Sequence, residues 1–80
     1  MEESDIIEKL NTVFSKELKK PVSLSVTTTA ADVPGWDSLT HIMIIDSTEK
    51  LFSVKFKLSE VIQFNNIGDM VACIKKKQSK

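Results

Sequence analysis

Three side chains stand out as groups that could take part in covalent or metal chemistry: Ser38, His41 and Cys73. One His and one Cys are too few for a zinc site without several carboxylates, and the chain has no Gly-rich phosphate-binding loop. His41 shares a helical stripe with Ile44 and Thr48, so we expect it to pack partly buried. For Cys73 we expect a small buried thiol rather than a reactive one. This inventory argues against an enzyme.

Ser38 occupies a position that suits a phosphate. It follows Asp37 at the predicted start of a helix, where unpaired backbone N–H groups concentrate positive potential. A phosphodiester on Ser38 would lie at this positive end, and Gly35 keeps bulk away from an incoming enzyme. Taken alone, however, the tripeptide from Asp37 to Leu39 is also typical of an unmodified helix cap. On these three residues alone, the unmodified cap is the favoured interpretation.

The helix that would carry Ser38 is predicted over residues 38–52. Pro34 and Gly35 bend the chain, and Asp37 can cap the free N–H groups that follow. One stripe of this helix can face another helix: His41, Ile44 or Ile45, Thr48 and Phe52. A second stripe begins at Ser38 and contains Ile42, Asp46 and Glu49, with Met43 and Lys50 beside it.

An earlier helix is predicted over residues 5–18. Its apolar residues recur at intervals of three and four: Ile6, Ile7, Leu10, Val13, Phe14 and Leu18. We expect Ser4 to cap the start of this helix, and Pro21 prevents its continuation.

Two further helices are predicted near the C-terminus. A short one over residues 59–64 would begin at Ser59, and a longer one would be capped by Asn65 or Asn66. The longer helix repeats Ile67, Met70, Val71 and Ile74 and runs into a Lys-rich end.

The stretch over residues 21–36 has no helical period. Val22, Leu24 and Val26 alternate as in a strand, but no second strand is predicted to pair with them. We therefore expect an ordered loop whose three apolar side chains tuck against the core, with a short strand as the alternative.

These elements predict an all-α fold, a small four-helix bundle with three longer helices, one short helix and a long loop between the first two. Residues 1–80 are expected to form a single domain and a monomer, in which residues 75–80 are a basic tail that frays. The Lys side chains of this tail suit the negative end of a helix dipole, so we expect a solvated helix end.

Composition limits the partners and the compartment. The chain has 11 basic and 11 acidic residues, so no overall field favours nucleic acid or an anionic membrane. The longest apolar run, Ile42 to Ile45, is far too short to span a bilayer, and acidic residues stand where a signal peptide would carry cations. A single Cys gives no internal disulfide. We expect a protein of the reducing cytoplasm.

The sequence resembles the acyl carrier proteins, the phosphopantetheine-binding carrier family. The resemblance rests on Gly35-Trp36-Asp37-Ser38-Leu39 opening a long helix, on Phe52 closing it, and on the stretch from Phe64 to Val71 that enters the last helix. These landmarks span most of the chain, and a length near 80 residues is usual for a free-standing member.

The resemblance implies a function for Ser38. In the family, the matching serine receives 4′-phosphopantetheine from coenzyme A through a phosphopantetheinyl transferase, and the thiol of the arm carries acyl groups as thioesters. The protein is then a non-catalytic carrier whose partners are this transferase and the acyl-loading and acyl-transfer enzymes. Asp37 and Leu39 would flank the attachment point and help the transferase to recognise it, and partners would read the helix over 38–52.

The chain departs from the usual pattern of the family at several positions. Pro34 replaces the usual Leu, Trp36 is large, and carboxylates are few beside Ser38. Ile42 and Met43 either add to the core or form an exposed docking patch, with Asp46 and Glu49 steering basic partner surfaces. The resemblance also implies an acyl pocket between the helix over 38–52 and the last helix, for which the candidate lining residues are Ile44, Ile45, Val61 and Ile67.

The pathway stays open at this stage. The cargo could belong to fatty-acid, polyketide-like or other specialised acyl biosynthesis. One alternative is a carrier of aminoacyl groups, as in D-alanyl or peptidyl carriers. Another is a helical protein-interaction module that carries no cofactor.

Overall fold

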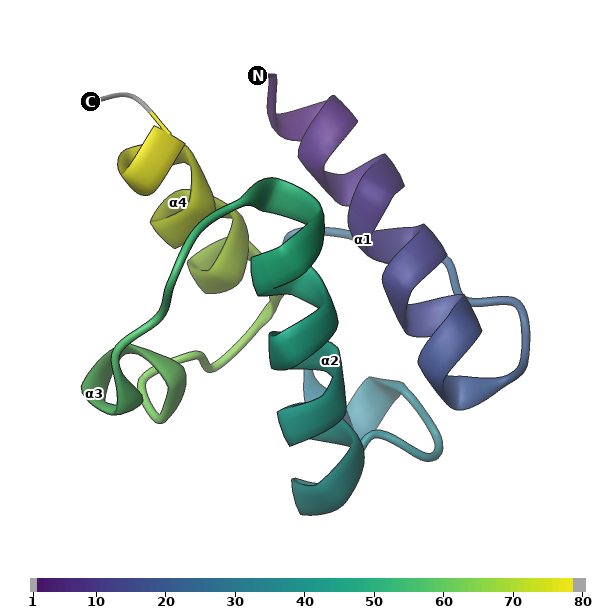
Figure 1. Ribbon diagram of the computed structural model, residues 1–80. Coiled ribbons are helices and arrows are strands. Elements are labelled where there is room, and N and C mark those ends of the chain that lie inside the picture. Colours follow the sequence, from purple (N-terminus) through teal and green to yellow (C-terminus); the bar gives the residue numbers. More distant parts are fainter. Residues whose placement is uncertain (1, 79–80) are drawn as a thin grey trace.

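The computed structural model describes residues 2–78, and every regular element in them is helical (Figure 1). The helices are α1 (Glu3–Leu18), α2 (Ser38–Phe52), α3 (Leu58–Val61) and α4 (Ile67–Gln78), with one turn of 3-10 helix at Ala30–Asp32. Figure 1 shows α1 and α2 running antiparallel and α4 beside them, while α3 lies apart from α1. The prediction of an all-α fold with three longer helices and a short one is confirmed.

One core joins the three longer helices. The buried face of α1 has the predicted three- and four-residue spacing, with Ile6, Leu10, Val13 and Phe14 inside. From α2 and α4 come Ile44, Ile45, Phe52, Ile67, Met70, Val71 and Ile74. Helix α1 contacts both α2 and α4, so it joins these two helices within the bundle.

The long connection between α1 and α2 is an ordered loop, and residues 2–78 contain no strand. Lys19 adopts a left-handed conformation, with φ of 58°, and ends α1 ahead of Pro21. Side chains of α1 then hold the loop: the Ser15 hydroxyl accepts a bond from the Val22 N–H, and Asn11 Oδ1 accepts one from the Leu24 N–H. Leu24 is buried as predicted.

The second half of this loop contacts the start of α4. The backbone N–H groups of Ile67 and Gly68 donate to the carbonyls of Thr28 and Val26, each at 2.8 Å. These bonds satisfy helix N–H groups that would otherwise lack partners, so the loop backbone is engaged by a helix end rather than by a strand. The Val26 side chain is 37% exposed, and the prediction that it packs in the core is wrong.

Gly68 permits this close approach. A Cβ atom there would lie 2.9 Å from the Val26 carbonyl oxygen, which is too short for any side chain. The loop and α4 can therefore meet only because this position lacks a side chain.

Two predicted helix starts are corrected. Helix α1 begins at Glu3 with Glu2 as its N-cap and no side-chain cap bond, so Ser4 lies within the first turn. Helix α3 begins at Leu58 rather than Ser59 and ends at Val61, because Glu60 accepts the Lys57 N–H and fixes the start one residue earlier. The predicted cap at Asn66 is confirmed, since its Oδ1 accepts the Asp69 N–H at 2.9 Å.

The basic C-terminal segment continues α4. Lys75, Lys76 and Lys77 form its last turns, where positive charge suits the helix dipole. Residues 79 and 80 of the predicted tail lie outside the described residues. Within the described part of the chain, none of the helices combines the length and the apolar character needed to cross a bilayer.

Candidate functional site

The start of α2 is held by a reciprocal cap between Asp37 and Thr40. Asp37 Oδ1 accepts the Thr40 N–H at 3.0 Å, and the Thr40 hydroxyl accepts the Asp37 N–H at 2.8 Å. Bonds from Thr40 hold the pKa of the Asp37 carboxyl below its ordinary value, so this carboxylate is ionised at neutral pH. Sequence reasoning found Asp37 but missed Thr40, although a side-chain acceptor three residues after a cap is a recognised signal.

This cap leaves Ser38 free. Ser38 is the first residue of α2 and is exposed, and nothing in residues 2–78 forms a hydrogen bond with its hydroxyl. The turn before it contains Gly35 at φ of +91°, a conformation that favours glycine. Since Asp37 rather than Ser38 supplies the cap, the Ser38 oxygen is available to form a covalent bond.

Trp36 and His41 form a polar and aromatic pair beside Ser38. The indole Nε1–H of Trp36 donates to His41 Nδ1 at 3.0 Å. The indole also packs edge-on against the buried ring of Phe14, with ring centroids 4.9 Å apart. Partial burial lowers the pKa of His41 from its ordinary value, which keeps the imidazole neutral. His41 is half-buried, as predicted, but its bond to Trp36 was not foreseen.

A groove of about 500 Å³ opens beside Ser38 between the start of α2 and the region of α3. Its lining residues are Ala30, Trp36, Asp37, Ser38, His41, Val61, Ile62, Phe64 and Asn65. Ser38 therefore borders both solvent and a partly apolar recess.

Only one of the predicted acyl-pocket residues lines this groove. Val61 does, whereas Ile44 and Ile67 are fully buried and Ile45 is 9% exposed, all three within the packed core. The sequence correctly marked these three as interior. It could not show that the groove beside Ser38 is lined by other residues.

The exposed face of α2 next to Ser38 is apolar. Leu39, Ile42 and Met43 are 69%, 67% and 42% exposed. This decides between the two interpretations of Ile42 and Met43: they lie at the surface and add nothing to the core.

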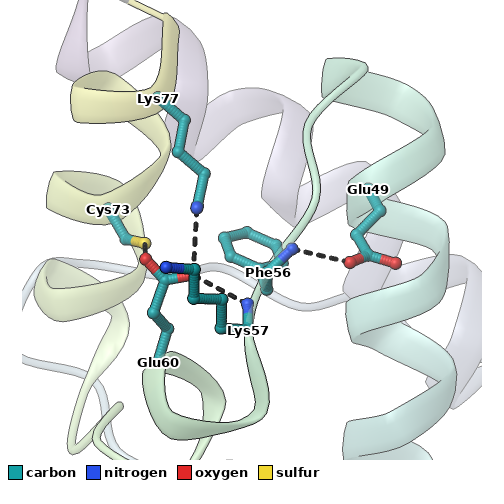
Figure 2. Close-up of polar contacts among 6 residues, drawn as sticks. All are labelled: Glu49, Phe56, Lys57, Glu60, Cys73 and Lys77. Atoms are coloured by element: carbon teal, nitrogen blue, oxygen red, sulfur yellow. Dashed lines mark hydrogen bonds and ion pairs between the residues drawn. The ribbon is translucent and has the colours of Figure 1, made fainter.

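The two carboxylates predicted to steer partners are engaged within the chain. Asp46 forms an ion pair with Lys50 at 3.1 Å. Glu49 accepts the backbone N–H of Phe56 at 2.8 Å, a bond that ties the segment after α2 back onto the helix (Figure 2). Glu49 therefore has a structural task that spacing along the helix did not reveal.

Cys73 belongs to a separate cluster on α4. Figure 2 shows Glu60 of α3 reaching between Cys73 and Lys77, and the Glu60 carboxylate pairs with Lys77 at 2.9 Å. The thiol lies 3.8 Å from the same carboxylate, to which it donates. Burial, followed by the charge of Glu60, raises the pKa of the Cys73 thiol, so the thiol stays protonated. The described residues contain no group of three or more His, Cys, Asp and Glu side chains able to hold a metal ion.

Comparison with known proteins gives the family. Residues 8–74 match the family described as the phosphopantetheine attachment site. The fold is similar to the solution NMR structure of the holo acyl carrier protein from Geobacter metallireducens, at 32% identity and a TM-score of 0.83, over 90% of this chain and 84% of that one. No curated protein matches the chain.

The match extends over most of the chain, and the chain belongs to the phosphopantetheine-binding carrier family. It has the fold of an acyl carrier protein and is a non-catalytic carrier whose prosthetic group is a covalently attached 4′-phosphopantetheine. The reactive thiol of such a carrier belongs to the prosthetic group, which accounts for the sparse chemical inventory of the chain.

Proposed function

We propose that Ser38 is the attachment point of 4′-phosphopantetheine and that the chain carries acyl intermediates as thioesters on this arm. The supporting observation is the exposed, unbonded hydroxyl at the first residue of α2, beside an Asp that already caps the helix. The helix N-terminus suits the negative charge of a phosphodiester. The Asp37 carboxylate does not bind this group and keeps Thr40 in place. When bound, the group supplies a thiol that forms and transfers thioesters.

The cargo proposed is an acyl group, in fatty-acid, polyketide-like or other specialised acyl biosynthesis. The similarity to a holo acyl carrier protein supports this choice over an aminoacyl cargo. Incubation of the holo protein with acyl-activating and with aminoacyl-activating enzymes discriminates the two, since thioester formation should occur with the former only.

The partners proposed are a phosphopantetheinyl transferase and enzymes that load and transfer acyl groups. We place their docking on the exposed apolar residues next to the attachment point, Leu39, Ile42 and Met43. Asp46 and Glu49 contribute less to partner docking than the sequence predicted, because Lys50 and the Phe56 backbone N–H already bind their carboxylates.

The attachment is tested by intact-mass measurement. The purified protein is incubated with coenzyme A, magnesium and a broad-range phosphopantetheinyl transferase, and a gain of one phosphopantetheine group is expected. Ser38→Ala should show no gain while keeping its helical circular dichroism, since the cap bonds belong to Asp37 and Thr40. Ser59→Ala, at an exposed serine of α3, is the matched control and should be modified like the wild type. An unmodified wild type beside a modified control carrier would refute the attachment.

A further inference from the structure

We propose that a basic recess between the end of α2 and the last turns of α4 binds an acidic segment of a partner protein. The charged and hydroxyl-bearing residues that line this basic recess are Ser53, Lys55, Glu60, Lys76 and Lys77. None of them belongs to the groove beside Ser38, so the inference does not rest on the proposed attachment.

The basic recess concentrates positive charge in a chain whose formal net charge is zero. Its volume is about 590 Å³, and its lining contains three Lys side chains and one Glu, which leaves a net charge of +2. Lys55 comes from the segment after α2, whereas Lys76 and Lys77 lie on α4. The fold therefore creates this concentration of charge from distant parts of the sequence. Because opposite charges steer and orient association, the recess favours an acidic partner.

The single carboxylate of the lining is already engaged within the chain. Glu60 accepts the backbone N–H of Lys57 at 2.7 Å and pairs with the Lys77 ammonium at 2.9 Å (Figure 2). Lys55, by contrast, is exposed and forms no ion pair within residues 2–78. The Ser53 hydroxyl is on an exposed residue and has no hydrogen-bond partner in this part of the chain. An ammonium and a hydroxyl therefore remain as donors for the carboxylates of a partner.

Contacts on both sides hold the basic recess in shape. Glu49 of α2 accepts the Phe56 N–H at 2.8 Å, which fixes the segment that contains Lys55. On α4, the Lys77 ammonium pairs with Glu60 and lies 5.8 Å from the centre of the Phe56 ring (Figure 2). A site whose residues are already ordered loses less conformational freedom on binding, which favours affinity.

The shape of the basic recess favours a protein segment over an anionic membrane. A membrane-binding surface places apolar side chains beside its cations, where they insert among the lipids. The two apolar lining residues of the recess, Val54 and Cys73, are half-buried instead. A recess of this volume admits single Asp or Glu side chains, which a protein segment presents and a bilayer does not.

The basic recess lies at the opposite end of α2 from Ser38. Ser38 opens this 15-residue helix and Ser53 follows its last residue, so roughly 20 Å separates them along the helix axis. Figure 1 shows the start of α2 and the end of α4 at opposite ends of the molecule. An acidic partner in the recess therefore leaves the surroundings of Ser38 accessible to a second protein.

Nuclear magnetic resonance titration of the full apo chain tests this inference. The probe is an N-acetylated hexaglutamate peptide, and the matching hexaglutamine peptide is the uncharged control. In low salt, hexaglutamate should shift the backbone resonances of Ser53, Lys55, Lys76 and Lys77, and added NaCl should weaken this binding severalfold because it screens exposed charges. Equal shifts with hexaglutamine, or shifts that leave these four residues unaffected, would overturn the proposal.

Two double variants sharpen the test. Lys55→Gln combined with Lys76→Gln removes two positive charges from the basic recess and should weaken hexaglutamate binding about fivefold or more. Lys9→Gln combined with Lys16→Gln removes the same charge from exposed positions of α1 and should weaken it less than about twofold. Both variants keep Lys77 and its ion pair. Equal weakening in the two variants would show that only the net charge matters and would refute the site.

Vesicle flotation tests the competing occupant. In the same low salt, vesicles of phosphatidylcholine and phosphatidylglycerol should recover no more of the chain than vesicles of phosphatidylcholine alone. Recovery on the anionic vesicles that is lost in the Lys55→Gln, Lys76→Gln variant would assign the basic recess to a membrane surface and overturn the proposal. All of these assays use the unmodified chain, so a failure of the attachment at Ser38 leaves their results unchanged.

Discussion

The hydroxyl of Ser38 and the thiol of Cys73 lie in two regions that differ in how far they leave a nucleophilic group exposed and free of hydrogen bonds. At the start of α2, the cap bonds go to Asp37 and Thr40, and Ser38 is left exposed and unbonded. On α4, the thiol donates to Glu60, and partial burial keeps it protonated. The comparison shows that the surroundings of a nucleophilic group, more than its type, decide whether it is available to form a covalent bond.

This contrast also explains why a carrier can tolerate a thiol of its own. A reactive cysteine would compete with the prosthetic group for acyl cargo or form a mixed disulfide with it. Glu60 helps to prevent this, because its negative charge opposes formation of a thiolate. The same carboxylate joins α3 to α4 through its ion pair with Lys77. Glu60 therefore both stabilises the fold and helps to keep the Cys73 thiol unreactive.

The largest effect is expected when the two thiols of the holo protein compete for an alkylating reagent. At pH 7.5, iodoacetamide should modify the exposed arm thiol about tenfold or more faster than Cys73, because only the thiolate reacts and the pKa of Cys73 is raised. Peptide mass spectrometry over time measures both rates, with holo Cys73→Ser as the control. Equal rates would break the contrast between the two regions.

The next largest effect is expected at a buried hydroxyl that forms no hydrogen bond within the described residues. Thr48 is 0% exposed, and its Oγ1 has no hydrogen-bond partner among the described residues. Thr48→Val keeps the shape and removes the unsatisfied group, so the free energy of unfolding should rise by about 1 kcal/mol in urea titration. Thr40→Val is the matched opposite, since the Thr40 hydroxyl is fully used, and it should lower the free energy of unfolding by about 1 kcal/mol. A destabilised Thr48→Val would show that the core hydroxyl is satisfied.

A smaller effect is expected from the charges around Cys73. Glu60→Gln removes the negative charge that raises the pKa of the thiol, so alkylation of Cys73 should accelerate by roughly threefold. Lys77→Gln removes a positive charge that lowers this pKa, and the rate should fall. Both rates are measured on the apo protein in low salt. Changes of the same sign in the two variants would contradict the electrostatic explanation.

The smallest effect is a pH dependence of stability from His41. Burial depresses its pKa in the folded protein below the ordinary 6.5, so at lower pH the unfolded chain takes up a proton that the folded chain does not. The contribution is fully present above pH 6.5 and is lost as the pH falls through the folded pKa. Urea unfolding between pH 7 and about 5 should show this loss in the wild type and not in His41→Gln. An equal loss in both would assign it to other groups.

Sequence reasoning identified the segment in which we propose attachment but described its surroundings incompletely. The order Gly35, Trp36, Asp37, Ser38 is local, and the structure shows the turn and the cap that this order predicts. The groove beside Ser38 is built from residues near 30, 36–41 and 61–65, and no local pattern brings these segments together. Docking by Asp46 and Glu49 was inferred from the family resemblance and from their place on the stripe that begins at Ser38. Neither reveals that both carboxylates have partners within the chain.

By itself, the sequence determined the three longer helices, their inward faces, the cap at Asp37 and a cap at Asn65 or Asn66. These features depend on residues three or four apart, whose interactions are the same in any fold. Only the tertiary structure decided that the loop backbone meets the start of α4, that Trp36 bonds to His41 beside a groove, and that Ile42 and Met43 face solvent. The reason is physical: exposure and long-range hydrogen bonds depend on which distant segments pack together, and a one-dimensional pattern does not carry that information.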